Sequence, residues 1–383
     1  MHEVSLQSKL PEIGTSIFSV MSKMAVDHNA INLAQGFPDF NCSDELIELV
    51  NHYHKKGYNQ YAPMGGVQKL RKQISKKIEK LYGRLYNVED EITVTSGATQ
   101  AIYTAITTVV QPGDEVIIVE PAYDSYVPGV KASGGIPIYV KLNQNDYSYN
   151  WEAIRNSISD KTKLIIINSP HNPTGSLITD VDIKQLEVLL KDTNIFIISD
   201  EVYEHIIFDG EKHISLAESD ELAKRTFVIS SFGKTFHTTG WKMGYCAAPD
   251  NLMKEFRKMH QFIVFSANTP IQHAYADYLK DESHYLNLNN FYGEKRDILI
   301  REIQKSKFKI MQCSGTYFQL LDYSDISSMN DFEFSEYLTK EVGIAVIPIS
   351  PFYDNGTKEN IIRICFAKRD EVLMKAAEIL SRL

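Results

Sequence analysis

The run Ile195-Phe-Ile-Ile198, followed at once by Ser199-Asp200-Glu-Val-Tyr203, is the stretch of sequence that decides the fold. Short apolar runs of the same kind recur along the chain, at Ile92–Thr95, Glu115–Val119, Ile136–Val140, Leu164–Ile167 and Thr226–Ile229. Continuous apolar runs are typical of strands in a parallel sheet covered on both faces, whereas a sheet with one exposed face shows alternation. These runs therefore predict a buried, mostly parallel sheet.

Helical segments separate the predicted strands. Apolar residues recur every three to four positions in residues 99–110 and 180–190, the period of a helix with one buried face. Strands and helices in alternation are the signature of a doubly wound α/β domain, which we place at residues 45–275. A helical stretch over 270–305 and strands at 309–323, 345–348 and 361–366 predict a smaller α+β domain, formed by residues 276–383 with the N-terminal segment 1–44.

Composition and charge exclude several classes of protein. The chain has 383 residues with 40 Lys+Arg and 49 Asp+Glu, a net charge of −9, so it lacks the basic surplus of a protein that binds nucleic acid or anionic lipid. Its N-terminus does not read as a secretory signal, and its apolar runs are far shorter than the roughly 20 residues of a membrane span. Its four cysteines are far apart in sequence and form no CxxC pair, which predicts neither a zinc site nor a redox motif. We expect a cytoplasmic protein without metal.

Polar residues follow the predicted strands, where the ligand crevice of an open α/β sheet lies. Ser96-Gly97-Ala98-Thr99 turns into a helix and offers backbone N–H groups to an anion such as phosphate, although a simple helix cap has the same pattern. The loop from Asn168 to Gly175 carries two asparagines. Asp200 ends a buried strand, where a carboxylate needs a partner, and a helix cap is an equally good interpretation of this residue alone.

Lys234 lies in Ser230-Ser231-Phe-Gly-Lys-Thr235, directly after another predicted strand. The Gly-Lys-Thr triplet resembles a P-loop, but that motif needs a glycine at the position of Val228. A lysine between a buried strand and Phe236 is a candidate for a reactive amine, because desolvation lowers the pKa of lysine. Most lysines instead extend to solvent. Lys242 adds a second cation close by in the sequence.

One cofactor requires all of these parts together. Pyridoxal phosphate needs a lysine for its aldehyde, a carboxylate that keeps its pyridinium nitrogen protonated, and a cradle for its phosphate. Lys234, Asp200 and the glycine turn at 96–99 are of these types, and Tyr203 and Asn172 could donate hydrogen bonds to the ring oxygen. Each part is a weak signal alone, but their joint order along the chain is a strong one.

The chain resembles the class I/II aminotransferases, which are fold-type I pyridoxal phosphate enzymes, and among them the bacterial methionine aminotransferases and the kynurenine/glutamine aminotransferases. The resemblance covers nearly the whole chain and rests on motifs in a fixed order: Ile31–Phe40, Asn59-Gln-Tyr61, Thr95–Thr99, Asn168–Pro173, Ser199–Tyr203, Ser230–Thr235, Gly240–Gly244 and Ile362–Phe366. It implies a large doubly wound, mostly parallel-sheet domain and a smaller α+β domain.

The resemblance also implies roles for single residues. Lys234 would bind the cofactor covalently and then act as the acid and base of the proton shift, and Asp200 would pair with the pyridinium nitrogen. Tyr203 and Asn172 would contact the ring hydroxyl, and Tyr123 would stack on the ring. The phosphate would be held by Gly97, Ala98, Thr99, Ser231 and Lys242, with Tyr61 from a second subunit. Shared sites of this kind imply a homodimer.

The resemblance also implies residues that bind the substrate. Arg363 would bind the α-carboxylate, for which its planar guanidinium is well suited, and the backbone of Gly36 would contact the same group. The aromatic residues Phe18, Phe37 and Phe265 match or neighbour pocket positions. An aromatic pocket fits methionine or a large neutral or aromatic amino acid, since thioethers pack well on ring edges. The expected reaction is ping-pong transfer of the amino group to a 2-oxo acid.

Two other functions fit parts of the same pattern. A C–S β-lyase acting on cystathionine or cysteine S-conjugates would use the same fold, cofactor, lysine and aspartate, so the sequence separates it poorly from a transaminase. A non-catalytic regulator built on this fold would carry an additional DNA-binding domain, whereas the aminotransferase resemblance here begins almost at the first residue.

Overall fold

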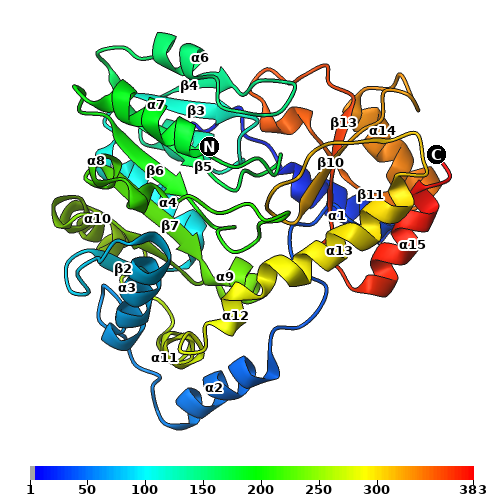
Figure 1. Ribbon diagram of the computed structural model, residues 1–383. Helices are drawn as coiled ribbons and strands as arrows, with labels where there is room; N and C mark the ends of the chain where they lie inside the picture. Colours follow the sequence, from blue (N-terminus) through cyan, green and yellow to red (C-terminus); the bar gives the residue numbers. More distant parts are fainter. Residues whose placement is uncertain (1–4) are drawn as a thin grey trace, which may run out of the picture.

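A seven-stranded sheet forms the large domain of the computed structural model, which describes residues 5–383 (Figure 1). Its order is β2-β8-β7-β6-β5-β3-β4, and its pairs are parallel except those of β8, which runs antiparallel to β2 and β7. The strands are β2 (Ile92–Thr95), β3 (Glu115–Glu120), β4 (Ile136–Lys141), β5 (Thr162–Asn168), β6 (Phe196–Asp200), β7 (Thr226–Ser231) and β8 (Gly244–Ala247). The six strands predicted from the apolar runs are confirmed, and β8 is an addition.

Helices cover both faces of this sheet, which explains why its strands are apolar throughout. In β5, Leu164 and Ile166 pack in the cluster that contains α4 and α10, whereas Ile165 and Ile167 pack in the cluster that contains α7. The helices of the large domain are α2 (Asp44–Lys55), α3 (Gln68–Tyr82), α4 (Gly97–Val109), α5 (Tyr126–Ala132), α6 (Trp151–Asn156), α7 (Asp180–Leu190), α8 (Asp220–Ala223), α9 (Phe232–Thr235), α10 (Asp250–Ile263) and α11 (Thr269–Tyr278).

The small domain is built on a four-stranded antiparallel sheet of order β12-β13-β10-β9 (Figure 1). These strands are β9 (Lys309–Ile310), β10 (Phe318–Asp322), β12 (Ile347–Pro348) and β13 (Ile361–Cys365). Strand β1 (Ile31–Asn32) pairs in parallel with β11 (Ile344–Ala345) and so ties the N-terminal segment to this part of the chain. The accompanying helices are α1 (Ile17–Asp27), α12 (Ser283–Leu286), α13 (Leu288–Ile303), α14 (Asp331–Tyr337) and α15 (Asp370–Leu380).

Three predictions for the second half of the chain were too coarse. The helical stretch 270–305 is divided into α11, α12 and α13. The strand expected over 309–323 is two strands, β9 and β10, with a loop between them in which Thr316 has a φ of 69°. The strand expected at 345–348 is shared between β11 and β12, which lie in different sheets. Over residues 5–383, no helix is long and apolar enough to cross a membrane.

Candidate active site

A cavity of about 230 Å³ opens at the carboxyl ends of β5, β6 and β7 and reaches β13 of the small domain. Most of the residues singled out from the sequence line it: Phe18, Gly36, Phe37, Gly97, Ala98, Thr99, Tyr123, Asn172, Asp200, Tyr203, Ser231, Lys234, Lys242 and Arg363. Tyr61 and Phe265 do not. The Tyr61 side chain is 83% exposed, and its ring packs edge-on against that of Phe265.

The carboxylate of Asp200 ends β6 and is buried. The Tyr126 hydroxyl donates to its Oδ2 at 2.6 Å, and the Val202 N–H donates to its Oδ1 at 3.4 Å. Burial raises the pKa of Asp200 to about 6 even though both hydrogen bonds act in the opposite direction. A buried carboxylate that forms no ion pair within residues 5–383 is suited to a cationic group of a ligand.

Lys234 lies on the one-turn helix α9, directly after β7. Its Nζ donates to the carbonyl oxygen of Gly36 at 2.9 Å and to the hydroxyl of Tyr317 at 2.6 Å. Burial lowers the pKa of Lys234 to about 8, and the nearby charge of Arg363 acts in the same direction. An amine with such a pKa is partly neutral near pH 7 and can act as a nucleophile and as a base.

An anion cradle lies at the N-terminus of α4. Gly97 has a φ of +79°, the helix has no acidic residue in its first turn, and the side chain of its N-cap residue Ser96 makes no capping bond. The side chain of Lys242 lies beside this turn, with its Cε 3.6 Å from where a Cβ on Gly97 would be. A Cβ on Gly244 of β8 would come within 2.7 Å of the Ser230 carbonyl oxygen, so a glycine is required for this close approach.

A third cation, Arg363 of β13, lies on the small-domain side of the cavity and is 1% exposed. Its Nη1 donates to Asn172 Oδ1 at 2.8 Å and its Nη2 donates to the Ala34 carbonyl oxygen at 3.2 Å, while its Nε is buried and finds no partner within residues 5–383. The ring of Phe318 lies against the guanidinium, 3.8 Å from centroid to Cζ. Burial lowers the pKa of Arg363 to about 10. Among the residues that the structure describes, no carboxylate pairs with this guanidinium, so it is suited to the carboxylate of a ligand.

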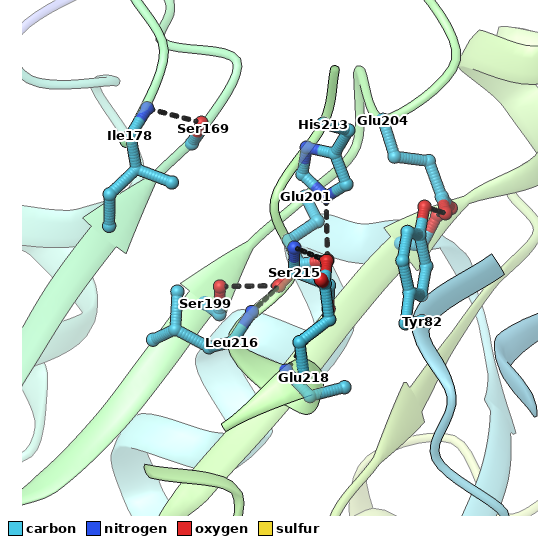
Figure 2. Close-up of polar contacts among 12 residues, drawn as sticks. Tyr82, Ser169, Ile178, Ser199, Glu201, Glu204, His213, Ser215, Leu216 and Glu218 are labelled. Atoms are coloured by element: carbon cyan, nitrogen blue, oxygen red, sulfur yellow. Dashed lines mark hydrogen bonds and ion pairs between the residues drawn. The ribbon is translucent and has the colours of Figure 1, made fainter. Parts of the chain in front are cut away.

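Two buried carboxylates, Glu201 and Glu204, belong to the turn that carries Asp200 and Tyr203, and Figure 2 shows Glu201 beside His213 and Glu204 beside Tyr82. Glu201 accepts hydrogen bonds from Ser199 Oγ at 2.7 Å and from the Leu216 N–H at 3.1 Å, and the His213 ring lies 2.9 Å from it. Glu204 accepts from Lys77 Nζ and from the Tyr82 hydroxyl, each at 2.6 Å. Neither Glu201 nor Glu204 lines the cavity, and their contacts hold the turn in place.

Sequence reasoning missed several residues of the site. Tyr126 and Tyr317 contact Asp200 and Lys234, but both come from elements remote in sequence and no motif marks them. Lys368 was also missed. Its buried Nζ donates to the Phe37 carbonyl oxygen at 2.9 Å and so braces the Gly36 loop. A lysine two residues after an apolar strand carries no signal of that contact.

The donor set fits pyridoxal phosphate. A lysine with a lowered pKa, a buried carboxylate without a cation partner and a helix N-terminus beside Lys242 are the three groups that this cofactor needs. A large mixed sheet with a small antiparallel-sheet domain is the fold of the type I enzymes. Fold and site together define a pyridoxal phosphate-dependent enzyme of fold type I.

Comparisons with known proteins narrow this class. The family model described as aminotransferase class I and II matches residues 28–380. The chain is 48% identical to the methionine aminotransferase of Escherichia coli K12 over 98% of both chains, and 35% identical to the kynurenine–oxoglutarate transaminase of Dictyostelium discoideum over 97% of this chain and 94% of that one. A solved E. coli structure, described as identifying a methionine aminotransferase function, superposes with a TM-score of 0.98 at 47% identity over the full length of both chains.

The chain belongs to the class I and II aminotransferases. It is therefore an enzyme that moves an amino group from an amino acid to a 2-oxo acid, and its family uses pyridoxal phosphate. The resemblance inferred from the sequence motifs is confirmed.

Proposed function

We propose that this aminotransferase uses methionine, or an aromatic or other large neutral amino acid, as its amino donor. The observation that carries the proposal is the 48% identity, over nearly the whole chain, to a methionine aminotransferase. The aromatic wall beside Arg363 supports it, because the rings of Phe18 and Phe318, which line the cavity, lie 5.1 and 3.8 Å from the guanidinium. Thioethers and aromatic rings both pack well on such a wall.

Substrate binding follows from the two ends of the cavity. Arg363 would bind the α-carboxylate with its free guanidinium edge, next to Asn172 and the backbone of Gly36. Phe18 and Phe37 would pack against the donor's side chain. Within the described residues, Arg363 is the arginine that lines this cavity, so a second, distal carboxylate would lack a matching guanidinium. Aspartate and glutamate should therefore be poor donors.

The cofactor would be held by groups from both sides of the sheet edge. Asp200 would pair with its pyridinium nitrogen, Tyr203 and Asn172 would contact its ring oxygen, and Tyr123 would stack on its ring. The phosphate would be held by Gly97, Ala98, Thr99, Ser231 and Lys242. When bound, pyridoxal phosphate supplies an aldehyde for the amines of the lysine and the substrate and a ring that withdraws electrons from the substrate α-carbon.

The chain's own part in the reaction is to bind, orient and move a proton. Arg363 fixes the carboxylate of the donor, and the aromatic wall fixes its side chain, so that the α-hydrogen meets Lys234 Nζ. The lowered pKa of Lys234, about 8, leaves the amine able to take this proton and return it one step later. The same groups would then serve the 2-oxo acid in the reverse direction, which predicts ping-pong kinetics.

Donor specificity is tested by mixing the purified holoenzyme with one amino acid at a time and no 2-oxo acid, and following the cofactor's visible absorbance. We expect methionine or phenylalanine to change the spectrum in a single turnover and a 2-oxo acid to restore it, whereas aspartate should react at least about tenfold more slowly. Continuous release of pyruvate and ammonia from cystathionine would instead indicate a β-lyase. No reaction with methionine or any aromatic donor would contradict the proposal.

We also propose that the enzyme is a homodimer whose sites are shared. Tyr61 and Phe265 do not line the cavity of their own chain, and their rings pack edge-on with centroids 5.3 Å apart. Phe262, three residues earlier in the chain than Phe265, is 86% exposed. Large exposed aromatic side chains of this kind are typical of interaction surfaces. A second copy of the chain would cover these side chains and receive Tyr61 at its phosphate cradle and Phe265 at its substrate pocket.

Shared sites are tested by mixing two inactive variants, Lys234→Ala and Tyr61→Ala, under conditions that exchange subunits. If Tyr61 serves the partner's site, each hybrid dimer contains one intact site, and an equal mixture should regain about a quarter of the wild-type activity. If Tyr61 serves its own chain, no intact site forms and the mixture stays inactive. Light scattering gives the mass of the assembly independently.

The domain division 45–275 against 1–44 with 276–383 is also a proposal. The pairing of β1 with β11 supports it, because it joins the N-terminal segment to the small domain. Limited proteolysis of the holoenzyme should release fragments cut near these two boundaries.

A further inference from the structure

Three hydrogen bonds join the amine of Lys234, the carbonyl oxygen of Gly36 and the hydroxyl of Tyr317 in a closed triangle. Its Nζ donates to the Gly36 carbonyl oxygen at 2.9 Å and to the Tyr317 hydroxyl at 2.6 Å. The Tyr317 hydroxyl donates in turn to the same Gly36 carbonyl oxygen, at 2.6 Å. Tyr317 is fully buried just before β10, in a part of the chain that the family motifs quoted above do not include.

The triangle accounts for each hydrogen of a neutral lysine amine. Such an amine has two hydrogens and one lone pair, and here the two hydrogens are directed to Gly36 and Tyr317. The lone pair is what remains to accept a proton. Once the lone pair has accepted a proton, the amine has a third N–H, which lies outside the triangle. The proton of this N–H can then be transferred again. The two acceptors thus leave one position of the nitrogen free in both protonation states.

We propose that Tyr317 is a positioning residue for the proton transfer, which holds the amine of Lys234, together with the Gly36 carbonyl, so that its free position faces the substrate. This inference rests on the proposed function, because it concerns the same lysine. In the step itself, the donor's Cα–H bond breaks, its proton forms a bond to Nζ, and its electron pair stays with the substrate carbon. Tyr317 gains and loses no proton overall.

The surroundings of the hydroxyl favour positioning over acid–base catalysis by Tyr317 itself. Burial raises the pKa of Tyr317 well above its usual value, so the phenol stays protonated and acts through its oxygen lone pairs and its O–H. Its ring is held by Tyr203, Tyr292 and Phe318, with centroids 5.1, 5.6 and 4.9 Å away. An oxygen held this rigidly can orient an amine at little entropic cost. The titratable groups that face Lys234 are Tyr203 and Tyr317 with Asp200, Lys242, Arg363 and Cys365.

The test is Tyr317→Phe in the full-length enzyme, with Tyr292→Phe as the matched control. Phenylalanine keeps the ring contacts of Tyr317 and removes only the hydroxyl. Tyr292 is equally buried and packs on Tyr317, but its hydroxyl has no hydrogen-bond partner within residues 5–383 and does not contact Lys234. A general effect of losing a buried hydroxyl should therefore affect both variants, and a specific effect should affect Tyr317→Phe alone.

Two readouts separate positioning from a structural role. With methionine as donor, Tyr317→Phe should lower kcat about tenfold, leave KM within about twofold, and raise the kinetic isotope effect of α-deuterated methionine. In protein loaded with pyridoxamine phosphate, in which the lysine amine is free, pH-dependent labelling read by mass spectrometry should show a lower pKa for Lys234 than in the wild type, because the amine has lost an acceptor. Tyr292→Phe should leave kcat, KM and this pKa unchanged.

The inference is overturned if Tyr317→Phe has the wild-type pKa of Lys234, or if its kcat and isotope effect equal those of Tyr292→Phe. The labelling does not depend on the donor. If the wild-type enzyme reacts with none of the donors, the proposed function is contradicted. The comparison of the Lys234 pKa values would still decide the role of Tyr317.

Discussion

Replacing Lys77 by methionine should destabilise the enzyme in a way that depends on pH. Lys77 of α3 and Glu204 form a buried ion pair with Nζ 2.6 Å from Oε1, and their side chains are 5% and 2% exposed. Burial alone would raise the pKa of Glu204, but the charge of Lys77 and its hydrogen bond to the carboxylate hold this pKa below its usual range. Methionine keeps the volume of the lysine stem and removes the charge, so a buried carboxylate loses its cation.

The size of the effect follows from what remains around Glu204. Breaking a buried ion pair by removing one partner costs about 3–5 kcal/mol. Here the hydroxyl groups of Ser230 and Tyr82 still donate to the carboxylate, which places the expected loss near the lower end, at about 3 kcal/mol. For a domain of this size, that loss corresponds to a fall of roughly 6–12 °C in the unfolding midpoint.

The pH dependence has a definite sign. In the wild type the pKa of Glu204 is lower in the folded than in the unfolded state, so the carboxylate stabilises the fold above about pH 4–5, and this contribution is lost as the pH falls. Without Lys77 the folded-state pKa of Glu204 rises instead, because burial is no longer offset, and protonation of the carboxyl relieves the unpaired charge. The destabilisation should therefore be largest near pH 8 and shrink towards pH 5.

Differential scanning fluorimetry of holoenzyme at pH 8 and at pH 5.5 measures both quantities. Lys80→Met is the matched control on the same helix, because Lys80 pairs with Glu282 at the surface and its side chain is 60% exposed. Surface pairs contribute about 0–1 kcal/mol, so its midpoint should stay close to that of the wild type at both pH values. The reasoning is refuted if Lys77→Met falls no further than Lys80→Met, or if its loss is the same at both pH values.

Three further variants test single contacts of the site. Arg363→Lys should lower kcat/KM for methionine about 100-fold, because lysine lacks the planar fork that can bind Asn172 and a carboxylate together. The control Arg369→Lys changes an exposed ion pair, so its kcat/KM should stay within twofold of the wild type in the same steady-state assay. Asp200→Asn should abolish transamination yet raise the unfolding midpoint of the cofactor-free protein at pH 8. The folded-state pKa of Asp200, about 6, lies above its ordinary value, so the ionised carboxylate destabilises that state above pH 6, and the gain should vanish near pH 4; equal midpoints at pH 8 would contradict this. Gly36→Ala places a Cβ 2.8 Å from Phe318 Cζ, so the loop must move, and we expect kcat to fall at least about tenfold with the fold intact by circular dichroism.

The fold was largely predictable because its strands are buried on both faces. Runs such as Leu164–Ile167 have no polar face, and their spacing by amphipathic helices leaves few alternatives. Strand β8 was missed since it is four residues long and begins at Gly244, a residue that sequence rules read as a loop. The loop between β9 and β10 was also missed, because the positive φ of Thr316 is imposed by tertiary packing and not by its own preference.

Much of the site could be found by one rule, that ligands bind beyond the carboxyl ends of parallel strands. The rule located the glycine turn at Gly97, the Asn172 loop, Asp200 and Lys234, all of which line the cavity. It could not locate Arg363, whose position was inferred from resemblance, since that residue lies on an antiparallel strand of the other sheet. Contacts across long stretches of chain, such as those of Tyr317, are fixed only when the sheets pack.

The charged side chains inside the cavity are not ones that the fold itself requires. Among the described residues that line the cavity, three are cationic, Lys234, Lys242 and Arg363, and one is a carboxylate, Asp200. Burial lowers the pKa of both Lys234 and Arg363. Groups whose charged forms are disfavoured in this way cost folding free energy, so neither helix propensity nor core packing calls for them. A phosphate and a substrate carboxylate would balance these positive charges. Their binding should therefore stabilise the folded protein and offset the cost of burying the cations. The Lys77–Glu204 and His213–Glu201 pairs, which do not line the cavity, hold the Asp200–Tyr203 turn in place against that cost.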